Sequence, residues 1–156
     1  MKEEIWKDIT GYEGLYQIST LGNVKSLGNG KSLNSLNHVE KIMKPLNRNG
    51  YLFVKLCKDG KPKCFNIHRL VAEAFLSNPD NLPCVNHKDE NKHNNNLDNL
   101  EFCSYQYNTT YGTAIERRAE KKRHPVKCLD LETNETYYFN SIIEADRKLN
   151  IRFQTI

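Results

Sequence analysis

The segment around His87 holds the side chains of this chain that are best suited to chemistry. The order of apolar and polar residues predicts a strand that ends at His87, a polar loop over residues 88–98 and a second strand from Leu100. Asn99 lies where the loop re-enters the second strand, and Asn108 lies in the first turns of a following helix. This order of elements brings an imidazole and several amide oxygens together at one point.

Such a group of side chains suits a divalent cation and an activated water molecule. Oxygen ligands favour a hard ion, Mg²⁺ or Mn²⁺, over zinc. A neutral histidine close to the ion is free to act as a general base on water. Without further evidence, however, a histidine in the position of His87 is more often a loop residue than a catalytic one.

Short elements upstream must position this segment. An Asp-Gly pair separates apolar runs at residues 51–57 and 63–68, which predicts a β-hairpin. The apolar residues that follow recur at helical spacing, and they predict a helix capped by Asn66 and ended by Pro79. Nearer the N-terminus, glycine-punctuated turns are followed by a strand predicted at residues 16–19.

The last third of the chain reads as a connection followed by a small unit. Residues 105–123 permit a helix interrupted by Gly112, and their polar second half favours a basic linker. Beyond the boundary at His124-Pro125, residues 126–139 predict one more hairpin. Ser141 then caps a final helix over residues 142–149.

Composition excludes several classes of protein. The chain has 156 residues, 38% of them hydrophobic, and no stretch approaches the ~20 apolar residues of a membrane span. The N-terminus has no apolar signal-peptide core, so we expect no cleaved secretion signal. The five cysteines form no Cys-x-x-Cys pair, which argues against structural zinc and a disulfide framework and favours a reducing, cytosol-like compartment.

The charges of the chain are segregated. Residues 41–69 carry eight basic side chains and one acid, and residues 117–127 carry six and one. Residues 70–116, between them, carry two basic and seven acidic side chains. Clustered Lys and Arg of this kind indicate a nucleic-acid partner, although two solvated charged loops explain the charges about as well.

The segment around His87 resembles the HNH, or ββα-metal, nucleases. The match is to the His-Asn-Asn variant of the motif, which is found in phage and intron-encoded homing endonucleases. His87, Asn99 and Asn108 match that motif in residue type and spacing. The helix that begins Ile67-His-Arg-Leu-Val-Ala is similar to the helix that precedes the motif in those enzymes.

Two further segments resemble modules that accompany this nuclease. Residues 4–27 are similar to a modular DNA-binding motif often attached to it, and residues 125–150 are similar to a second DNA-binding repeat. With residues 66–108, these segments cover most of the chain. Two independent motifs in the family's order are a more specific signal than a lone histidine and asparagine.

The resemblance implies a role for each matching residue. His87 is expected to be the general base, and Asn99 to orient its imidazole or to hold the loop. Asn108 and Asn86 are expected to bind the metal, one Mg²⁺ or Mn²⁺ per active site. Asn86 stands where many relatives have Asp, so its neutral amide predicts a weaker site or one that depends on substrate phosphate. Asp89 is a reserve carboxylate, more in keeping with a loop-forming role.

The resemblance also implies a fold and a division of the chain. We expect an α+β protein whose antiparallel, β-rich DNA-binding module spans residues 1–65, followed by a ββα-metal nuclease core at residues 66–112. A basic linker at residues 113–125 leads to a β-hairpin and helix at residues 126–156, a DNA-binding repeat truncated after its first helix. We therefore expect weaker or less specific binding than a full-length relative shows.

The function implied is site-selective cutting of double-stranded DNA by metal-assisted phosphodiester hydrolysis, with a monomer nicking one strand. We expect a cytoplasmic, DNA-associated protein with no membrane partner and no obligate protein partner. The basic residues expected to contact DNA are Lys44, Arg48, Lys55, Lys61, Lys63, Arg69, Arg117, Arg118, Lys121, Lys122 and Arg123.

An alternative from a different class is a non-catalytic DNA-binding protein that keeps the nuclease scaffold. The neutral Asn86 and the short C-terminal repeat favour it slightly. An RNA-binding module is a weaker alternative because the chain has no RNP-type aromatic pattern.

Overall fold

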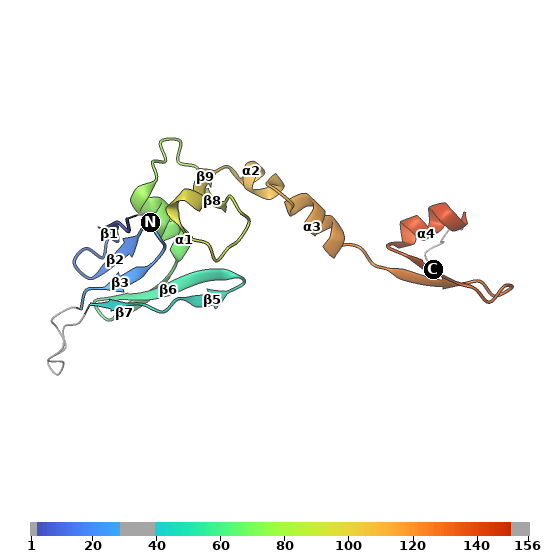
Figure 1. Cartoon of the computed structure of the whole chain (residues 1–156), viewed down its shortest axis with the longest axis horizontal. Helices are drawn as coiled ribbons and strands as arrows, with labels where there is room; N and C mark the ends of the chain where they lie inside the picture. Colours follow the sequence, from blue (N-terminus) through green and yellow to red (C-terminus); the bar gives the residue numbers. More distant parts are fainter. Residues whose placement is uncertain (1–2, 29–39, 151–156) are drawn as a thin grey trace. The chain divides into compact units, whose positions relative to one another are not determined.

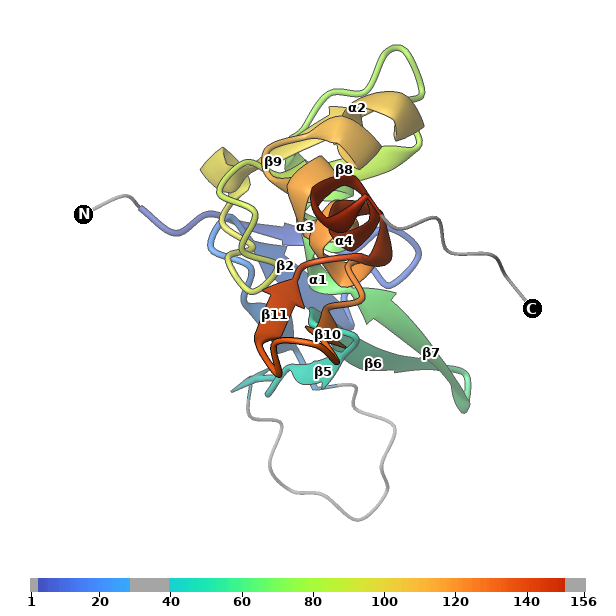
Figure 2. The same cartoon turned by 90° about the vertical axis from the view of Figure 1, so that its right-hand side faces the viewer.

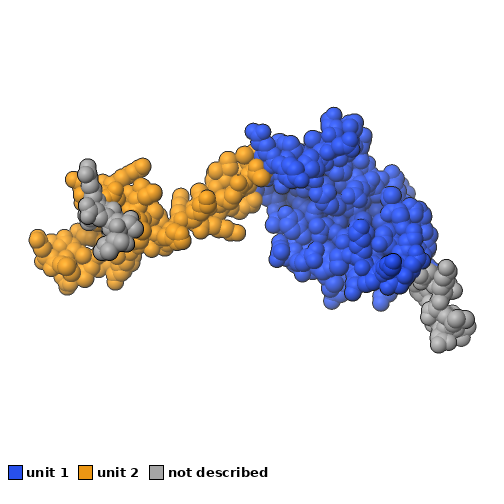
Figure 3. Space-filling view, turned by 180° about the vertical axis from the view of Figure 1, so that it is seen from behind, with its two compact units in different colours: residues 1–108 blue, residues 109–156 orange. Residues whose placement is uncertain are grey.

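The fold was obtained as a computed structural model that describes residues 3–28 and 40–150 (Figure 1). The chain divides into two compact units, Met1–Asn108 and Thr109–Ile156, which Figure 3 colours separately. The sequence had placed boundaries at residues 65/66, 112/113 and 125/126. The first unit thus contains both the N-terminal module and the residues of the expected nuclease motif.

The described residues of the first unit form three antiparallel sheets. A four-stranded sheet has the order β1 (Trp6–Asp8), β2 (Tyr16–Ser19), β3 (Val24–Ser26), β4 (Lys41–Ile42). A three-stranded sheet has the order β5 (Leu46–Arg48), β6 (Tyr51–Lys58), β7 (Lys61–Asn66). The third is the hairpin of β8 (Cys84–His87) and β9 (Leu100–Cys103), whose connection includes the 3₁₀ turn η1 (Leu97–Asn99).

Helix α1 (Ile67–Phe75) holds these sheets together. It contacts β2, β6, β7, β8 and β9, and both views in Figures 1 and 2 show it between the β8–β9 hairpin and the β5–β7 sheet. Its apolar residues, spaced three and four apart, meet core side chains that every sheet supplies. The fully buried members of this core are Ile18, Val24, Val54, Leu56, Ile67, Val71, Ala72 and Leu100.

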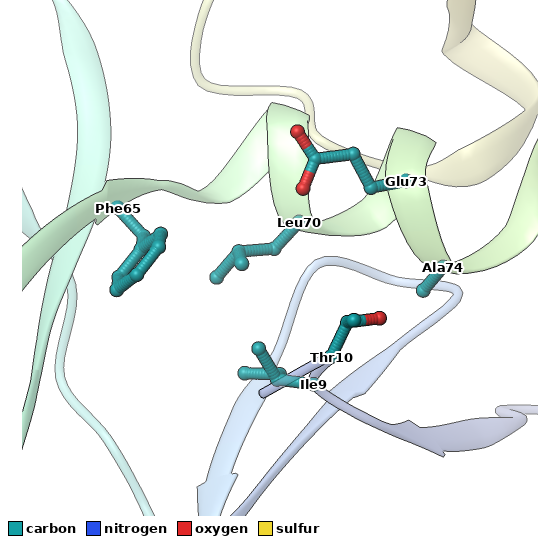
Figure 4. Close-up of a pocket in the computed structure, with 6 residues that line it drawn as sticks. All are labelled: Ile9, Thr10, Phe65, Leu70, Glu73 and Ala74. Atoms are coloured by element: carbon teal, nitrogen blue, oxygen red, sulfur yellow. The ribbon is translucent and has the colours of Figure 1, made fainter. Parts of the chain in front are cut away.

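The seam between the N-terminal module and α1 leaves one small hollow (Figure 4). Its lining residues are Ile9, Thr10, Phe65, Leu70, Glu73 and Ala74. No residue of the expected active site lines it, and we treat it as a packing feature.

The β8–β9 hairpin continues into α2 (Tyr105–Thr110), the helix of the ββα arrangement. The hydroxyl oxygen of Ser104 accepts the backbone N–H of Tyr107 at 3.1 Å and so satisfies one free donor of the first turn. The second unit contains α3 (Ala114–Lys121), the hairpin of β10 (Val126–Leu129) and β11 (Thr136–Phe139), and α4 (Ile142–Leu149).

The α+β prediction and most predicted elements are confirmed. The Asp-Gly hairpin forms as β6 and β7, and α1 begins after Asn66, although the Asn66 side chain makes no capping hydrogen bond. The Ser141 hydroxyl accepts the backbone N–H of Glu144 at 3.1 Å and caps α4 as predicted. Among residues 3–28 and 40–150, no helix has the length and apolar character of a membrane span.

The structure differs from the sequence prediction in two places. β1, β4 and β5 were not predicted, because they are two or three residues long and mostly exposed, and backbone pairing rather than an apolar pattern forms them. The polar stretch expected to be a linker contains α3. Its Ala, Glu, Arg and Lys residues are strong helix formers, so it is helical although none of its residues is buried.

Candidate active site

The register of the β8–β9 hairpin determines which side chains face one another. Asn86 pairs with Glu101, and His87 pairs with Leu100. The amide nitrogen of Asn86 donates a hydrogen bond to a carboxylate oxygen of Glu101 at 2.9 Å. The Asn86 amide is therefore held by its nitrogen, and its oxygen is the atom left for a cation.

The His87 ring is fixed by a single amide group. His87 is 5% exposed, and its Nε2 lies 3.1 Å from Oδ1 of Asn95. The amide nitrogen of Asn95 donates to the carbonyl oxygen of His93 at 3.3 Å, so the amide oxygen faces the imidazole. An amide oxygen only accepts, so Nε2 of neutral His87 carries the proton and Nδ1 keeps the lone pair. The ring is thus held in the tautomer that takes up a proton at Nδ1.

Burial keeps His87 in its neutral form. Loss of water around the ring lowers the pKa of His87 below its ordinary value, more than the Asn95 hydrogen bond and the charge of Asp89 raise it. The nearby Lys92 charge lowers it further. A neutral imidazole at physiological pH can accept a proton from water.

A second buried histidine lies against the first. The rings of His68 and His87 meet edge to face, with centroids 5.1 Å apart, and the Tyr51 ring lies 5.2 Å from that of His68. Burial, and then the charges of His87 and Arg69, lower the pKa of His68 to about 4. Its Nδ1 is the one buried side-chain nitrogen or oxygen in the described part of the chain that lacks a hydrogen-bond partner. His68 thus places a neutral polar ring in the wall of the site.

The loop between β8 and β9 is held by Asp89 and Asn99. The Asn99 amide nitrogen donates to Asp89 and to the carbonyl oxygen of Asn94, both at 2.8 Å, and its oxygen accepts the Asp89 N–H at 3.0 Å. Asp89 also accepts from the Asn94 amide at 2.7 Å and from the Asn91 N–H at 2.9 Å. Hydrogen bonds from Asn94, then from Asn91 and Asn99, lower the pKa of Asp89. Of the two roles that the sequence left open for Asn99, these contacts correspond to holding the loop.

The donor set available to a metal ion is nearly neutral. Asn108 is exposed in the second turn of α2, where its backbone N–H donates to the carbonyl oxygen of Ser104 at 3.0 Å. Residues 3–28 and 40–150 contain no group of three or more His, Cys, Asp or Glu side chains that could hold a metal. Amide oxygens of Asn86 and Asn108 fit a hard cation, and phosphate oxygens of a substrate would complete its shell.

The basic residues expected to contact DNA are exposed, and several are held by neighbours. The Arg48 guanidinium lies 5.0 Å from the centre of the Phe53 ring on the outer face of the β5–β7 sheet, and Lys63 lies 5.1 Å from that of Phe65. Arg69 donates to the carbonyl oxygen of Pro83 at 2.8 Å. The other exposed members are Lys44, Lys55 and Lys61 in the first unit, and Arg117, Arg118, Lys121, Lys122 and Arg123 in the second.

Sequence reasoning missed three residues of this site. Asn95, Glu101 and His68 were assigned no role in the site from the sequence, and the structure places them there. Glu101 could have been found from the predicted pairing of the two strands. Both strands have four residues, and pairing them end to end sets Glu101 opposite Asn86. No signal in the sequence distinguishes Asn95 from its neighbours Asn94 and Asn96.

Comparisons with known proteins identify relatives of this chain. Residues 4–57 match the family model described as the NUMOD4 motif. An HNH endonuclease of Acanthamoeba polyphaga mimivirus is 35% identical over 142 residues, which are 90% of this chain and 39% of the relative. The DNA endonuclease I-HmuI of Bacillus phage SP01 is 41% identical over 103 residues, which are 66% of this chain and 54% of the relative.

A solved structure is also similar. It describes DNA binding and cleavage by the HNH homing endonuclease I-HmuI, and it matches with a TM-score of 0.56 and 32% identity over 95% of this chain and 84% of that one. The chain spans between about a third and about half of the length of the curated relatives it matches.

Proposed function

Since this chain belongs to the HNH homing endonuclease family, we propose that it is a site-selective DNA endonuclease that hydrolyses phosphodiester bonds. The observation that carries the proposal is the buried, neutral His87, whose tautomer is set by Asn95 at the end of β8. A ring held in this way presents Nδ1 as a base.

His87 performs the proton transfer in this proposal. Nδ1 takes a proton from the attacking water, and Oδ1 of Asn95 accepts a hydrogen bond from Nε2–H, which stabilises the imidazolium that forms. General-base help of this kind contributes roughly 10²–10⁴-fold in rate. Asn99 and Asp89 hold the loop on which Asn95 stands, so that ring and acceptor keep their geometry.

Asn86 and Asn108 are the residues that would hold a divalent ion, Mg²⁺ or Mn²⁺. A bound ion supplies neutralisation of the phosphate charge and stabilisation of the departing 3′-oxygen. Glu101 holds the Asn86 amide through its nitrogen and so keeps the oxygen available. With one such site per chain, a monomer nicks one strand.

The substrate is double-stranded DNA. Exposed Arg48 and Lys55 on the β5–β6 strands and the basic residues of α3 supply cations for phosphate contacts. The NUMOD4 match over residues 4–57 includes this part of the β5–β7 sheet. Contacts with phosphate position the protein but do not read sequence, so we assign the target site to no residue.

The test is cleavage of supercoiled plasmid at low salt with Mg²⁺, with Mn²⁺ and with EDTA. We expect nicked circles from the wild type with metal, none with EDTA and none from His87→Ala. His124→Ala is the control, because His124 is an exposed histidine in the second unit, and this variant should cut as the wild type does. DNA binding without nicking, on plasmids that include candidate target sites, would replace the proposal with a non-catalytic DNA-binding protein.

A further inference from the structure

A turn of the N-terminal module packs directly on the loop that carries Asn95. The backbone N–H of Leu97 donates to the carbonyl oxygen of Thr20 at 2.8 Å. Gly22 lies so close to the loop that a Cβ atom there would stand 2.8 Å from Cβ and 3.1 Å from the carbonyl oxygen of Asn95. Unstrained Cβ atoms do not approach other atoms this closely, so only glycine fits.

Hydrogen bonds hold the turn that presents Gly22. Ser19 is fully buried, and its hydroxyl oxygen accepts the backbone N–H groups of Leu21 at 3.3 Å and Asn23 at 3.1 Å. The Gly22 N–H donates to the carbonyl oxygen of Ser19 at 3.0 Å, with φ of +80° at Gly22. A surface held in this way can support a neighbouring loop.

Asn95 connects the turn to the imidazole. Asn95 is 5% exposed, with Gly22 against its backbone and Cβ and with His87 against its amide oxygen at 3.1 Å. A shift of the Asn95 backbone therefore changes the hydrogen bond that orients the ring. Asn95 is therefore the one residue that lies between Gly22 of the β2–β3 turn and the His87 imidazole in this series of contacts.

The geometry points to Gly22 as a positioning residue of the active site, through which the NUMOD4 module sets the place of His87 in addition to any contact with DNA. This inference rests on the proposed nuclease function. It assigns the module a role in the chemical step, whereas a module that only binds DNA would have no effect on the position of His87. Loss of the Gly22 contact should lower kcat and leave KM for DNA unchanged.

Gly22→Ala tests this, with Gly11→Ala as the matched control. Both glycines have φ of +80° and belong to the same module, so both variants carry the same backbone strain, but nothing lies within 4 Å of a Cβ at Gly11. We expect kcat on plasmid to fall about 10–100-fold in Gly22→Ala, as for a catalytic group displaced by a fraction of an ångström to an ångström. Gly11→Ala should keep the kcat of the wild type. Equal kcat values in the two variants overturn the inference.

A double-mutant cycle tests the path. In the Asn95→Ala background the acceptor for His87 is already absent, so adding Gly22→Ala should lower kcat no further. If Gly22→Ala lowers kcat in that background by the same factor as in the protein that keeps Asn95, Gly22 does not act through Asn95 and the inference fails.

A readout without catalysis separates this inference from the proposed function. The ring ¹⁵N signals of His87, assigned with His87→Ala, should move in Gly22→Ala and stay in place in Gly11→Ala, in protein without DNA. Unmoved signals in Gly22→Ala overturn the inference even where cleavage is observed. Moved signals support it even where the wild type fails to cut, a result that would overturn the nuclease proposal alone.

Ser19→Ala provides a second variant that adds no atoms. It removes the hydroxyl that holds the turn, so kcat should fall several-fold and the His87 signals should move in the same direction. If Gly22→Ala does not fold, this variant decides the question by the same measurements. Unchanged kcat and unchanged ring signals in Ser19→Ala would then contradict the inference.

Discussion

Oδ1 of Asn95 lies 3.1 Å from Nε2 of His87, and the Asn95 amide nitrogen donates to the carbonyl oxygen of His93. The amide cannot turn over without losing both hydrogen bonds. The imidazole therefore has one tautomer and one orientation before any substrate arrives, and no charged partner is needed to set them. This distinguishes the site from those in which a carboxylate orients the histidine.

Replacement of Asn95 should change the rate and its pH dependence in separable ways. Asn95→Ala removes the acceptor and should lower kcat about 10–100-fold. Asn95→Asp keeps an acceptor but adds a negative charge, which raises the pKa of His87 and should move the acidic limb of the rate–pH profile to higher pH. Single-turnover nicking rates as a function of pH measure both effects.

The control for Asn95 is Asn96→Ala, the exposed neighbouring asparagine. It should keep the rate and the profile of the wild type. An Asn95→Asp profile that coincides with that of the wild type would remove Asn95 from the positioning of His87.

The free energy of unfolding should decrease as the pH is lowered, because His68 is buried in its neutral form. The pKa of His68 is about 4 in the folded protein and about 6.5 when unfolded, so the unfolded chain binds more protons between these values. The free energy of unfolding is therefore undiminished above pH 6.5 and falls as pH drops toward 4. At pH 4.5 the loss is about 2–3 kcal/mol, from the shift in pKa at 1.36 kcal/mol per unit.

Urea unfolding at pH 7.5 and pH 4.5 measures this loss. His68→Gln should show a smaller decrease between the two pH values, whereas His93→Gln, at an exposed position, should show the full decrease. Equal decreases in all three proteins would show that His68 is not held neutral by burial.

The pair of Asn86 and Glu101 predicts a metal-dependent change in stability. Asn86→Asp replaces a hydrogen bond of 2.9 Å with two carboxylates at the same separation, and their repulsion should lower the melting temperature without metal. Mg²⁺ or Mn²⁺ should restore it, because the added charge strengthens the expected cation site. Glu101→Gln in the Asn86→Asp background should restore it without metal.

Thermal melts of these variants, with EDTA and with Mn²⁺, decide the matter. Glu101→Gln alone is the control, since it keeps a hydrogen-bonding partner for Asn86 and should melt near the wild type in both conditions. An Asn86→Asp protein whose melting temperature is the same with and without metal would argue against Asn86 as a ligand.

The sequence predicted the elements whose signals are local. The Asp-Gly turn between β6 and β7, the helical spacing of α1 and the Ser141 cap of α4 all depend on neighbouring residues, and each is confirmed. The strands β1 and β4 pair with segments farther away along the chain, which a short polar sequence does not reveal. The strand β5 pairs with β6 across the two-residue turn Asn49-Gly50, a local signal that the sequence analysis did not use.

The same division applies to the site. His87 stands out because its residue type is rare among its asparagine neighbours and because the motif is recognisable. Asn95 could not be distinguished, since its role depends on a backbone contact with Gly22 and on the amide orientation set by His93. The charge balance indicated nucleic acid, but the three-dimensional face that carries each cation depends on the register of the strands.

The outer face of the β5–β7 sheet should make phosphate contacts that depend on salt. Arg48 pairs with Tyr51 and Lys55 pairs with Cys64, so both cations project from the face opposite Val54 and Leu56, which are buried. Each phosphate contact that is lost lowers the slope of log K against log salt by about 0.9. Arg48→Gln with Lys55→Gln should therefore weaken DNA binding and reduce the slope by about 2, with kcat at saturating DNA unchanged.

Lys25→Gln is the control, because the Lys25 ammonium already lies 3.2 Å from Glu40, and its slope should equal that of the wild type. Fluorescence anisotropy with duplex DNA across a salt series measures these slopes, and an unchanged slope in the double variant would exclude this face from the DNA interface.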